Sequence, residues 1–261
     1  MRAATFITFL TVSPVYAGEI VAFSATDFDG ADIVIVGEIH DDPTHHQVQA
    51  DIIALLDPTA IVFEMLTSDQ AMQITSDTIN SPDLGDLLEW EANGWPDFDM
   101  YAPIFTAAED AKIIGTAPSP EMAAQARDDI LAAFTDQRFE LHIPLDEDEQ
   151  RTREQGMQDG HCGALPAEIL PWFVDQQRFR DAVFARAALE AFETFGGPVV
   201  VITGNGHART DWGMPVYLHP ASPDTHVLSI GQITAPSDTP PYDLWRVTPP
   251  IDRPDPCAAF E

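Results

Sequence analysis

The stretch from Gly37 to His46, GEIHDDPTHH, concentrates side chains that can bind metal ions or transfer protons. It holds three imidazoles and three carboxylates in ten positions, directly after the apolar run from Ile33 to Val36. Carboxylates and imidazoles are ligands for divalent metal ions, and the same groups act as general acids and bases. What they can do here depends on which other groups the chain brings beside them.

Two other apolar runs also end in polar side chains. Glu64 follows the run 61–63, and the motif GNGH at 204–207 follows the run 199–203. The carboxyl ends of parallel strands meet at one edge of a sheet, and ligands bind in the crevice outside that edge. Four residues are therefore expected to share one crevice, as catalytic groups or as metal ligands: Glu38, His40, Glu64 and His207.

Each of these residues also fits a structural role when it is considered alone. A Glu after a strand can cap a helix or form a surface ion pair, and His207 can be a turn residue. The motif Gly-x-x-His occurs at two strand ends, 37–40 and 204–207, and this repetition favours a shared site. Gly204 and Gly206 are expected to turn the backbone sharply and to let it approach a ligand closely.

Hydrophobic periodicity predicts an α/β fold with a mostly parallel sheet, helices on both faces and the site at the C-terminal ends of the strands. Strands are expected at residues 32–37, 60–65, 112–116, 198–203, 216–218 and 227–230. Helices are expected at 43–56, 68–80, 84–92, 121–135 and 167–195. Residues 136–163 are predicted to be polar and irregular, with the acidic run at 146–149 as a solvated helix start.

Composition limits the possible partners. The 261 residues include 12 Lys and Arg against 43 Asp and Glu, a net charge of −31. This excludes nucleic acid as an expected partner, because binding a phosphate backbone needs clustered basic side chains. Residues 1–17 resemble a signal peptide, which predicts a periplasmic or secreted protein. Residues 18–261 are expected to form a single α/β domain, with a Pro-rich tail from Pro236 wrapped over its surface.

The two cysteines, Cys162 and Cys257, leave two states open. They can form one disulfide in an oxidising compartment, or remain two free or buried thiols.

Four sequence blocks in this order are similar to a known family: GEIHDDPTHHQVQ, VFEML, QQRFRDAVFA and GNGHARTDWGMPVYL. They resemble the ChaN-like haem-binding uptake family of the Tiki superfamily, over residues 33–230. The resemblance implies haem binding for iron uptake at the cell envelope, haem shared across a homodimer, and an outer-membrane haem receptor as an expected partner. The wider superfamily implies metal-dependent peptidase or esterase chemistry.

The resemblance also implies site residues. The catalytic or metal-binding positions that match are Glu38, His40, Glu64 and His207. The expected haem-binding residues are Tyr101, His46, Arg180, Asp181, Asn205 and Arg209, with Tyr101 as the candidate axial ligand. The chain departs from the family in lacking the lipid-accepting cysteine. It also reads TAPSP at 116–120, where the family usually carries an Asn-x-Pro-Arg stretch.

Two functions follow from different classes. A haem-binding protein would hold haem against the aromatic segment that contains Trp90, Trp95, Phe98 and Tyr101, which could equally be core packing. Haem carboxylates would need Arg178, Arg180 or Arg209, and the scarcity of basic residues counts against haem. The alternative is a hydrolase that uses a divalent ion such as Zn, Mn or Co to activate water. The family resemblance favours haem.

Overall fold

The computed structural model describes residues 18–255, 257 and 258. The predicted signal peptide, residues 1–17, lies outside the described residues. Within these described residues, an open sheet of seven strands, all parallel, runs through the middle in the order β1-β7-β6-β2-β5-β3-β4. The strands are β1 (Gly18–Glu19), β2 (Ile33–Glu38), β3 (Ala60–Phe63), β4 (Lys112–Gly115), β5 (Val199–Gly204), β6 (Val227–Ile233) and β7 (Leu244–Val247). The predicted α/β class is confirmed.

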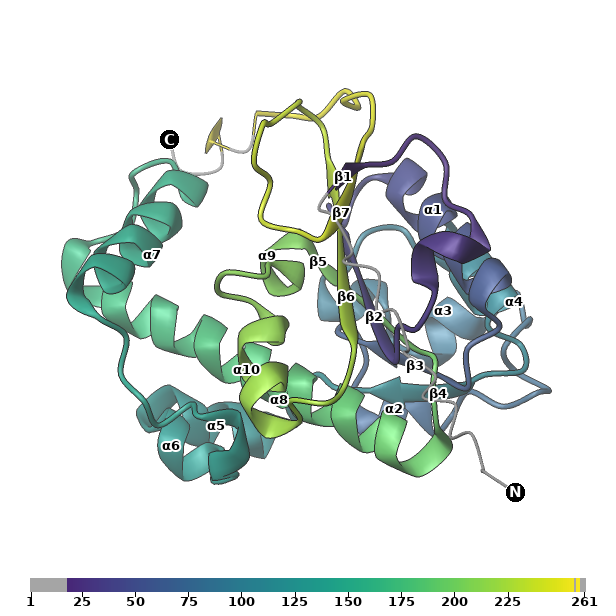
Figure 1. Cartoon of the computed structure of the whole chain (residues 1–261), viewed down its shortest axis with the longest axis horizontal. Helices are drawn as coiled ribbons and strands as arrows, with labels where there is room; N and C mark the ends of the chain where they lie inside the picture. The colour runs from purple at the N-terminus through teal and green to yellow at the C-terminus, as the bar shows by residue number, and fades with distance from the viewer. Residues whose placement is uncertain (1–17, 256, 259–261) are drawn as a thin grey trace, which may run out of the picture.

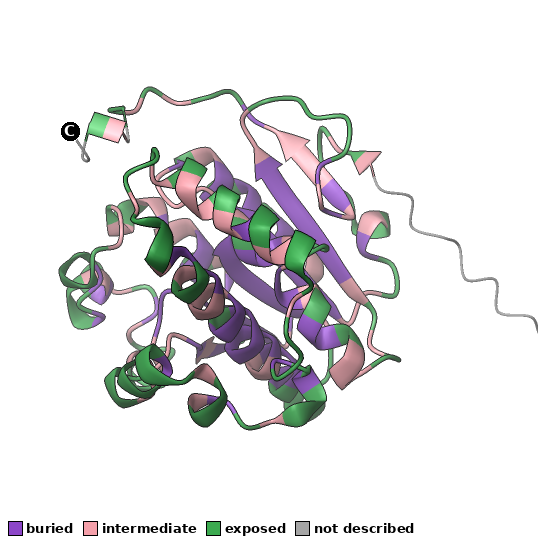
Figure 2. Ribbon diagram, turned by 90° about the vertical axis from the view of Figure 1, so that its left-hand side faces the viewer, coloured by how far each residue is buried: buried purple, intermediate pink, exposed green. Residues whose placement is uncertain are grey.

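Helices cover both faces of this sheet (Figure 1). The α-helices are α1 (Pro43–Leu56), α2 (Ser68–Ala71), α3 (Leu84–Leu87), α4 (Ala102–Ala107), α5 (Pro120–Asp128), α6 (Ile130–Ala133), α7 (Glu147–Gly160), α8 (Leu170–Phe195), α9 (Asn205–Ala208) and α10 (Met214–Ala221). Short 3-10 turns lie at Ala25–Phe28, Glu91–Asn93, Phe98–Met100, Gln137–Phe139 and Ala167–Ile169. Figure 2 shows the buried strands between helices whose outer faces are exposed.

Alternation along the central strands divides the apolar core into two layers. Val34 and Val36 of β2 face the side covered by α1 and α4, whereas Ile33 and Ile35 face the side covered by α8 and α10. Successive side chains of a strand point to opposite faces, so a strand that is covered on both sides must be apolar throughout. This explains why β2, β3 and β5 read as continuous apolar runs.

The helix after β2 begins and ends at the residues that the sequence predicts. The Asp42 side chain accepts a hydrogen bond from the Thr44 amide at 3.0 Å, and Pro43 occupies the first turn. Both features are typical of a helix start, because the first amides have no partner within the helix. Asp57 ends α1 in the left-handed conformation. This fixed start holds the β2–α1 loop, and the histidines beside it, against the strand ends.

Residues 216–218 were predicted to be a strand, and this prediction is wrong. They lie in α10, where Met214, Tyr217 and Leu218 are buried. That spacing of three and four residues forms one helical face, which packs beside α8. The local run of β-branched and aromatic residues was misleading because the packing surface of α8 decides the conformation.

Other predicted helix boundaries also need correction. Only Ser68–Ala71 and Leu84–Leu87 are α-helical within the predicted ranges 68–80 and 84–92. The range 121–135 is interrupted at Asp129, whose side chain accepts hydrogen bonds from two amides and starts α6. Residues 136–163 were predicted to be irregular, but they contain α7. The predicted helix start at 146–149 is confirmed, with the Asp146 side chain as its cap.

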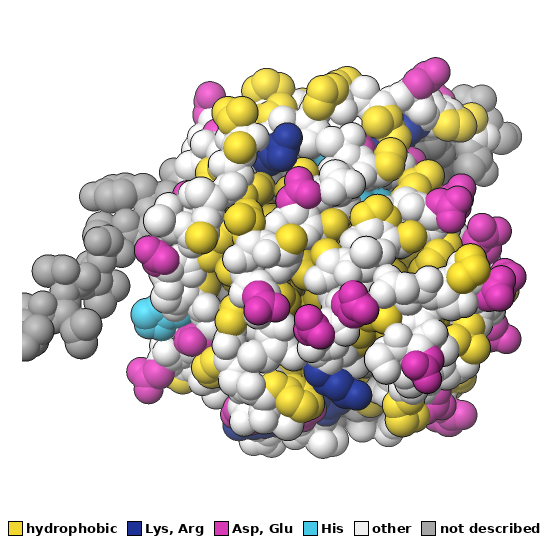
Figure 3. Space-filling model, turned by 90° about the vertical axis from the view of Figure 1, so that its right-hand side faces the viewer, with side chains coloured by type: hydrophobic (Ala, Val, Ile, Leu, Met, Phe, Trp, Pro, Cys, Tyr) yellow, Lys and Arg dark blue, Asp and Glu magenta, His cyan; other side chains and the backbone are white. Residues whose placement is uncertain are grey.

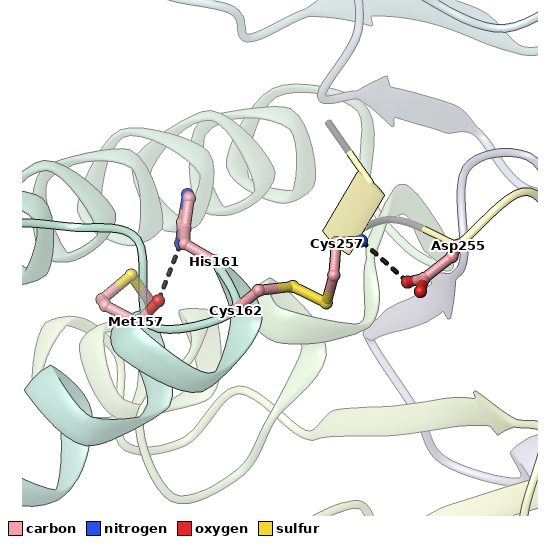
Figure 4. Close-up of a disulfide and its surroundings, with 5 residues drawn as sticks. All are labelled: Met157, His161, Cys162, Asp255 and Cys257. Carbon is pink, nitrogen blue, oxygen red and sulfur yellow. Dashed lines mark hydrogen bonds between the residues drawn. A yellow bond between two sulfur atoms is a disulfide. The ribbon is translucent and has the colours of Figure 1, made fainter. Parts of the chain in front are cut away.

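The Pro-rich tail does more than wrap the surface. It contributes β7, which pairs in parallel with β6, and then crosses toward α7 (Figure 1). A disulfide joins Cys257 of the tail to Cys162 just after α7 (Figure 4). Arg253 forms an ion pair with Asp41 at 2.9 Å. The two cysteines therefore pair, and the tail connects the β2–α1 loop with the end of α7.

Among the described residues, no helix combines the length and apolar character needed to cross a membrane. Acidic side chains are spread over the face in Figure 3, with few basic ones among them.

Candidate functional site

Three adjacent strands bring the predicted residues together. The central order β2-β5-β3 places the ends of these strands side by side. Glu38 ends β2, Glu64 follows β3, and His207 lies in the short helix after β5. Glu64 Oε1 lies 3.5 Å from His207 Nε2. The predicted convergence at one edge of the sheet is confirmed.

A cavity of about 550 Å³ opens at this edge. Its size is within the range typical of small-molecule sites, roughly 300–1,000 Å³. Eight of the ten predicted site residues line it: Glu38, His40, Glu64, Arg180, Asp181, Asn205, His207 and Arg209. The crevice outside the strand ends is therefore the candidate site.

Glu38 connects the groups on one side of the cavity floor. Its Oε1 atom accepts hydrogen bonds from the Tyr101 hydroxyl at 2.5 Å and from His40 Nδ1 at 2.7 Å. His46 Nε2 approaches Oε2 at 3.6 Å. Burial alone would raise the pKa of Glu38, but the two imidazoles outweigh burial and lower this pKa to about 2. Glu38 is therefore a carboxylate at neutral pH.

His40 presents its second nitrogen to the cavity. Its side chain is 34% exposed, and Nδ1 is held by Glu38. Burial acts to lower the pKa of His40, but the adjacent carboxylate of Glu38 raises it above the ordinary value. A Cβ at Gly204 would lie 3.0 Å from His40 Nε2. Gly204 is thus needed for this close approach, and not for the sharp turn that the sequence suggested, because its φ is −63°.

Glu64 forms the middle of the floor. Its Oε2 atom accepts hydrogen bonds from the Thr203 hydroxyl and from the Gly204 amide, each at 2.7 Å. Burial acts to raise the pKa of Glu64, but the charges of His207 and His40 and these two donors lower it overall. Thr203 was not predicted as a site residue, and its signal is only that it directly precedes the GNGH motif.

His207 is held between two acids. Its Nδ1 atom lies 2.6 Å from Asp181 Oδ1 on α8, and its Nε2 atom faces Glu64. Burial acts to lower the pKa of His207, but the charges of Glu64 and Asp181 raise it. Burial raises the pKa of Asp181, against the effect of His207. His207 therefore retains a proton more strongly than a free imidazole.

The floor thus contains two imidazoles that are oriented in the same way. His40 and His207 each bind a carboxylate through Nδ1 and direct Nε2 toward Glu64 or the cavity. Such pairing fixes the ring and makes the free nitrogen a better ligand or base. The arrangement can coordinate a ligand through an imidazole, or hold and transfer a proton.

Some predicted residues lie outside the cavity wall. Tyr101 and His46 are fully buried and contact each other, with ring centroids 3.9 Å apart. Both lie behind Glu38, so their contact with the cavity passes through that carboxylate. Asn205 lines the cavity, but its side-chain amide binds the Gln232 backbone at 2.6 and 3.0 Å. Its side-chain amide therefore connects the start of α9, directly after β5, to β6.

The aromatic segment lies partly in the core and partly beside His40, and Arg178 does not line the cavity. Trp90 is buried and packs against Tyr101 and Phe98, with centroid distances of 4.6 and 5.4 Å. Trp95 contacts His40, with ring centroids 5.1 Å apart. Arg178 donates to the carbonyl of Leu141 at 3.0 Å and holds the loop before α7.

The sequence did not reveal the wall opposite the strand ends. Arg153 and Met157 of α7, together with Trp212, line the cavity. Arg153 and Met157 were missed because α7 lies in a segment that was predicted to be irregular. The available signal was the pair Glu149 and Arg153, four residues apart on one helix face, which forms a hydrogen-bonded ion pair.

The arrangement of the described site residues does not favour a metal ion. Within the described part of the chain, no group of three or more His, Cys, Asp or Glu side chains is arranged to hold one. One oxygen of each carboxylate, Oε1 of Glu38 and Oε2 of Glu64, already accepts two hydrogen bonds. The metal-site hypothesis therefore gains no support from the geometry.

Fold and site together define an α/β protein with a ligand cavity at the ends of parallel strands. Residues 25–218 match the family described as haem-binding uptake, Tiki superfamily, ChaN, and the chain belongs to this family. No protein with a curated description matches the sequence.

Two solved structures illustrate the similarity in fold. ChaN of Campylobacter jejuni shares 17% sequence identity, covers 84% of this chain and 89% of its own, and gives a TM-score of 0.63. The type III effector HopBA1 shares 12% identity, covers 87% of this chain and 92% of its own, and gives a TM-score of 0.51. At these identities the likeness concerns the fold.

Proposed function

We propose that this protein binds haem in the cavity at the strand ends, with His40 Nε2 as the axial ligand. The observation that carries the proposal is the position of His40. Its Nδ1 is held by Glu38 while the side chain remains 34% exposed at the cavity. A carboxylate on the other nitrogen is the usual support for a ligating histidine. Membership of the haem-binding uptake family supports the choice of ligand.

The surroundings fit a flat, largely apolar ligand. Ile39, Met157, Val174 and Trp212 supply apolar surface around the opening. His207 also lies at the cavity floor, but it is held between Asp181 and Glu64, so it is less free to coordinate. Tyr101, which the sequence suggested as the ligand, instead donates to Glu38 and supports the orientation of His40. Bound haem would supply an iron centre whose properties depend on its axial ligand.

Titration with hemin tests the proposal. The full chain is expected to give a saturable shift of the Soret band. His40→Ala is expected to lose the spectrum of an imidazole-ligated iron, whereas His219→Ala, on the exposed side of α10, should behave as wild type. In His40→Gly, added imidazole should restore the spectrum. Affinity should fall with falling pH through the raised pKa of His40, because the proton competes for Nε2.

Two results would reject this assignment. A Soret shift that is unchanged in His40→Ala places the iron ligand elsewhere. The absence of any shift removes haem as the ligand and leaves the metal-dependent hydrolase as the hypothesis to test.

The proposed location is the periplasm or the exterior of the cell, with an outer-membrane haem receptor as the expected source of ligand. The Cys162–Cys257 disulfide supports this, because such bonds persist in oxidising compartments. Fractionation of cells that produce the full chain tests it. Recovery from the cytoplasm with both cysteines reduced would contradict it.

Two copies of the chain are proposed to bind haem together. Cofacial haem binding is described for ChaN of Campylobacter jejuni. A second copy could complete the enclosure of a ligand that lies in the open cavity. Light scattering during a hemin titration should then show the mass of the complex doubling, and a constant monomer mass would contradict a shared site.

A further inference from the structure

One wall of the cavity is basic, although the protein is strongly acidic. The chain carries 12 Lys and Arg against 43 Asp and Glu. Three of these basic residues, Arg153, Arg180 and Arg209, nevertheless line this cavity. We call these three residues, with Trp212, the arginine wall. An even distribution of so few basic side chains would not place three of them at one opening.

Two of the arginines contact the Trp212 ring through cation–π interactions. The guanidinium carbon of Arg209 lies 4.0 Å from the centroid of the Trp212 ring, and that of Arg153 lies 5.4 Å from it. Both guanidinium groups also pair with acids, Arg153 with Glu149 at 2.5 Å and Arg209 with Asp211 at 2.8 Å. These contacts fix the stack in place. The Trp212 Nε1 atom is buried and has no hydrogen-bond acceptor among the described residues.

Arg180 differs from its two neighbours. It is exposed, it lines the cavity, and no acidic side chain of the described residues pairs with it. The next residue, Asp181, is engaged with His207 instead. The five N–H donors of Arg180 therefore remain available to a ligand in the cavity.

The acids of the floor are engaged by imidazoles and not by Arg180. Glu38 binds His40, and Glu64 and Asp181 share His207, at hydrogen-bond or ion-pair distance. An anionic group that enters the cavity would therefore meet Arg180 without a carboxylate of the described residues already paired with it.

We propose that Arg180, which lines the same cavity as Arg153, Trp212 and Arg209, binds a carboxylate of the ligand and selects ligands whose carboxylates are free. A guanidinium can donate two parallel hydrogen bonds to a carboxylate, and this geometry distinguishes a free acid from its ester. The inference rests on the proposed haem function, because haem is planar and carries two carboxylates.

Paired titrations with hemin and hemin dimethyl ester test the inference. The wild-type protein should bind hemin about tenfold more tightly than the ester, the effect expected for one charge-assisted hydrogen-bonded contact. Arg180→Met should weaken hemin binding by about the same factor and leave ester binding unchanged. Arg127→Met is the matched control, because Arg127 is also exposed but lies on α5, outside the cavity. It should bind both compounds as wild type does.

The outcomes separate this inference from the proposed function. Equal affinity of the wild type for hemin and its ester, or unchanged hemin binding in Arg180→Met, overturns the role of Arg180 and leaves haem binding intact. Failure of both compounds to bind overturns the proposed function and this inference with it. Thermal unfolding of Arg180→Met should match wild type, because the side chain is exposed and unpaired.

Discussion

The disulfide between Cys162 and Cys257 allows a prediction whose size follows from the fold. The two residues are 95 positions apart in the chain. Replacing both with Ser should destabilise the protein mainly by increasing the conformational entropy of the unfolded chain. The folded tail should stay in place, because β7 remains paired with β6, and Arg253 remains bonded to Asp41.

The expected effect comes from the entropy of closing a loop. For a loop of about 100 residues, this entropy corresponds to about 4.7 kcal/mol of unfolding free energy at 25 °C. Native disulfides usually contribute about 2–4 kcal/mol, so the calculated value is an upper bound. For a chain of this size, 1 kcal/mol changes Tm by roughly 2–4 °C, so the largest expected loss is roughly 10–20 °C.

Urea unfolding followed by tryptophan fluorescence measures the change. The Cys162→Ser/Cys257→Ser protein should unfold at lower urea than wild type. A reducing agent should bring wild type to the same midpoint and leave the double variant unchanged. A loss of less than about 1 kcal/mol would refute the reasoning, because the bond would then hardly restrict the unfolded chain. Hemin binding by the folded variant should be retained.

Three further predictions concern the site and its support. Gly115→Ala should destabilise the protein by about 3 kcal/mol in urea unfolding, because the new Cβ would overlap the Thr67 carbonyl. A variant as stable as wild type would contradict this contact. Asp181→Asn should lower the pKa of His207 in an NMR titration, because the charge of Asp181 raises this pKa. An unchanged pKa of His207 would mean that Glu64 alone raises it. The unfolding free energy should fall by about 3 kcal/mol as pH falls from 4.5 toward 2, because the unfolded chain protonates Glu38 before the folded protein does. Glu38→Gln should remove this part of the pH dependence, and an unaltered pH profile would assign it to other acids.

Local signals predicted the elements in which neighbouring residues are sufficient to define the structure. The run Ile33–Val36 predicted a buried strand, and all four residues are fully buried. Asp42 and Pro43 predicted the start of α1, and the acidic run at 146–149 predicted the start of α7. Caps and apolar runs act within one or two turns, so they are visible in the sequence.

The sequence by itself determined the α/β class, the parallel strands and the edge at which Glu38, His40, Glu64 and His207 meet. Parallel strand direction suffices for that result, because it brings the carboxyl ends of distant strands to one edge of the sheet. Only the tertiary structure decided that residues 216–218 are helical and that the tail adds β7. Only the tertiary structure brought Arg153, Trp212 and Arg180 to one cavity. These features depend on packing between segments far apart in the chain, and such packing leaves no periodic pattern in either segment alone.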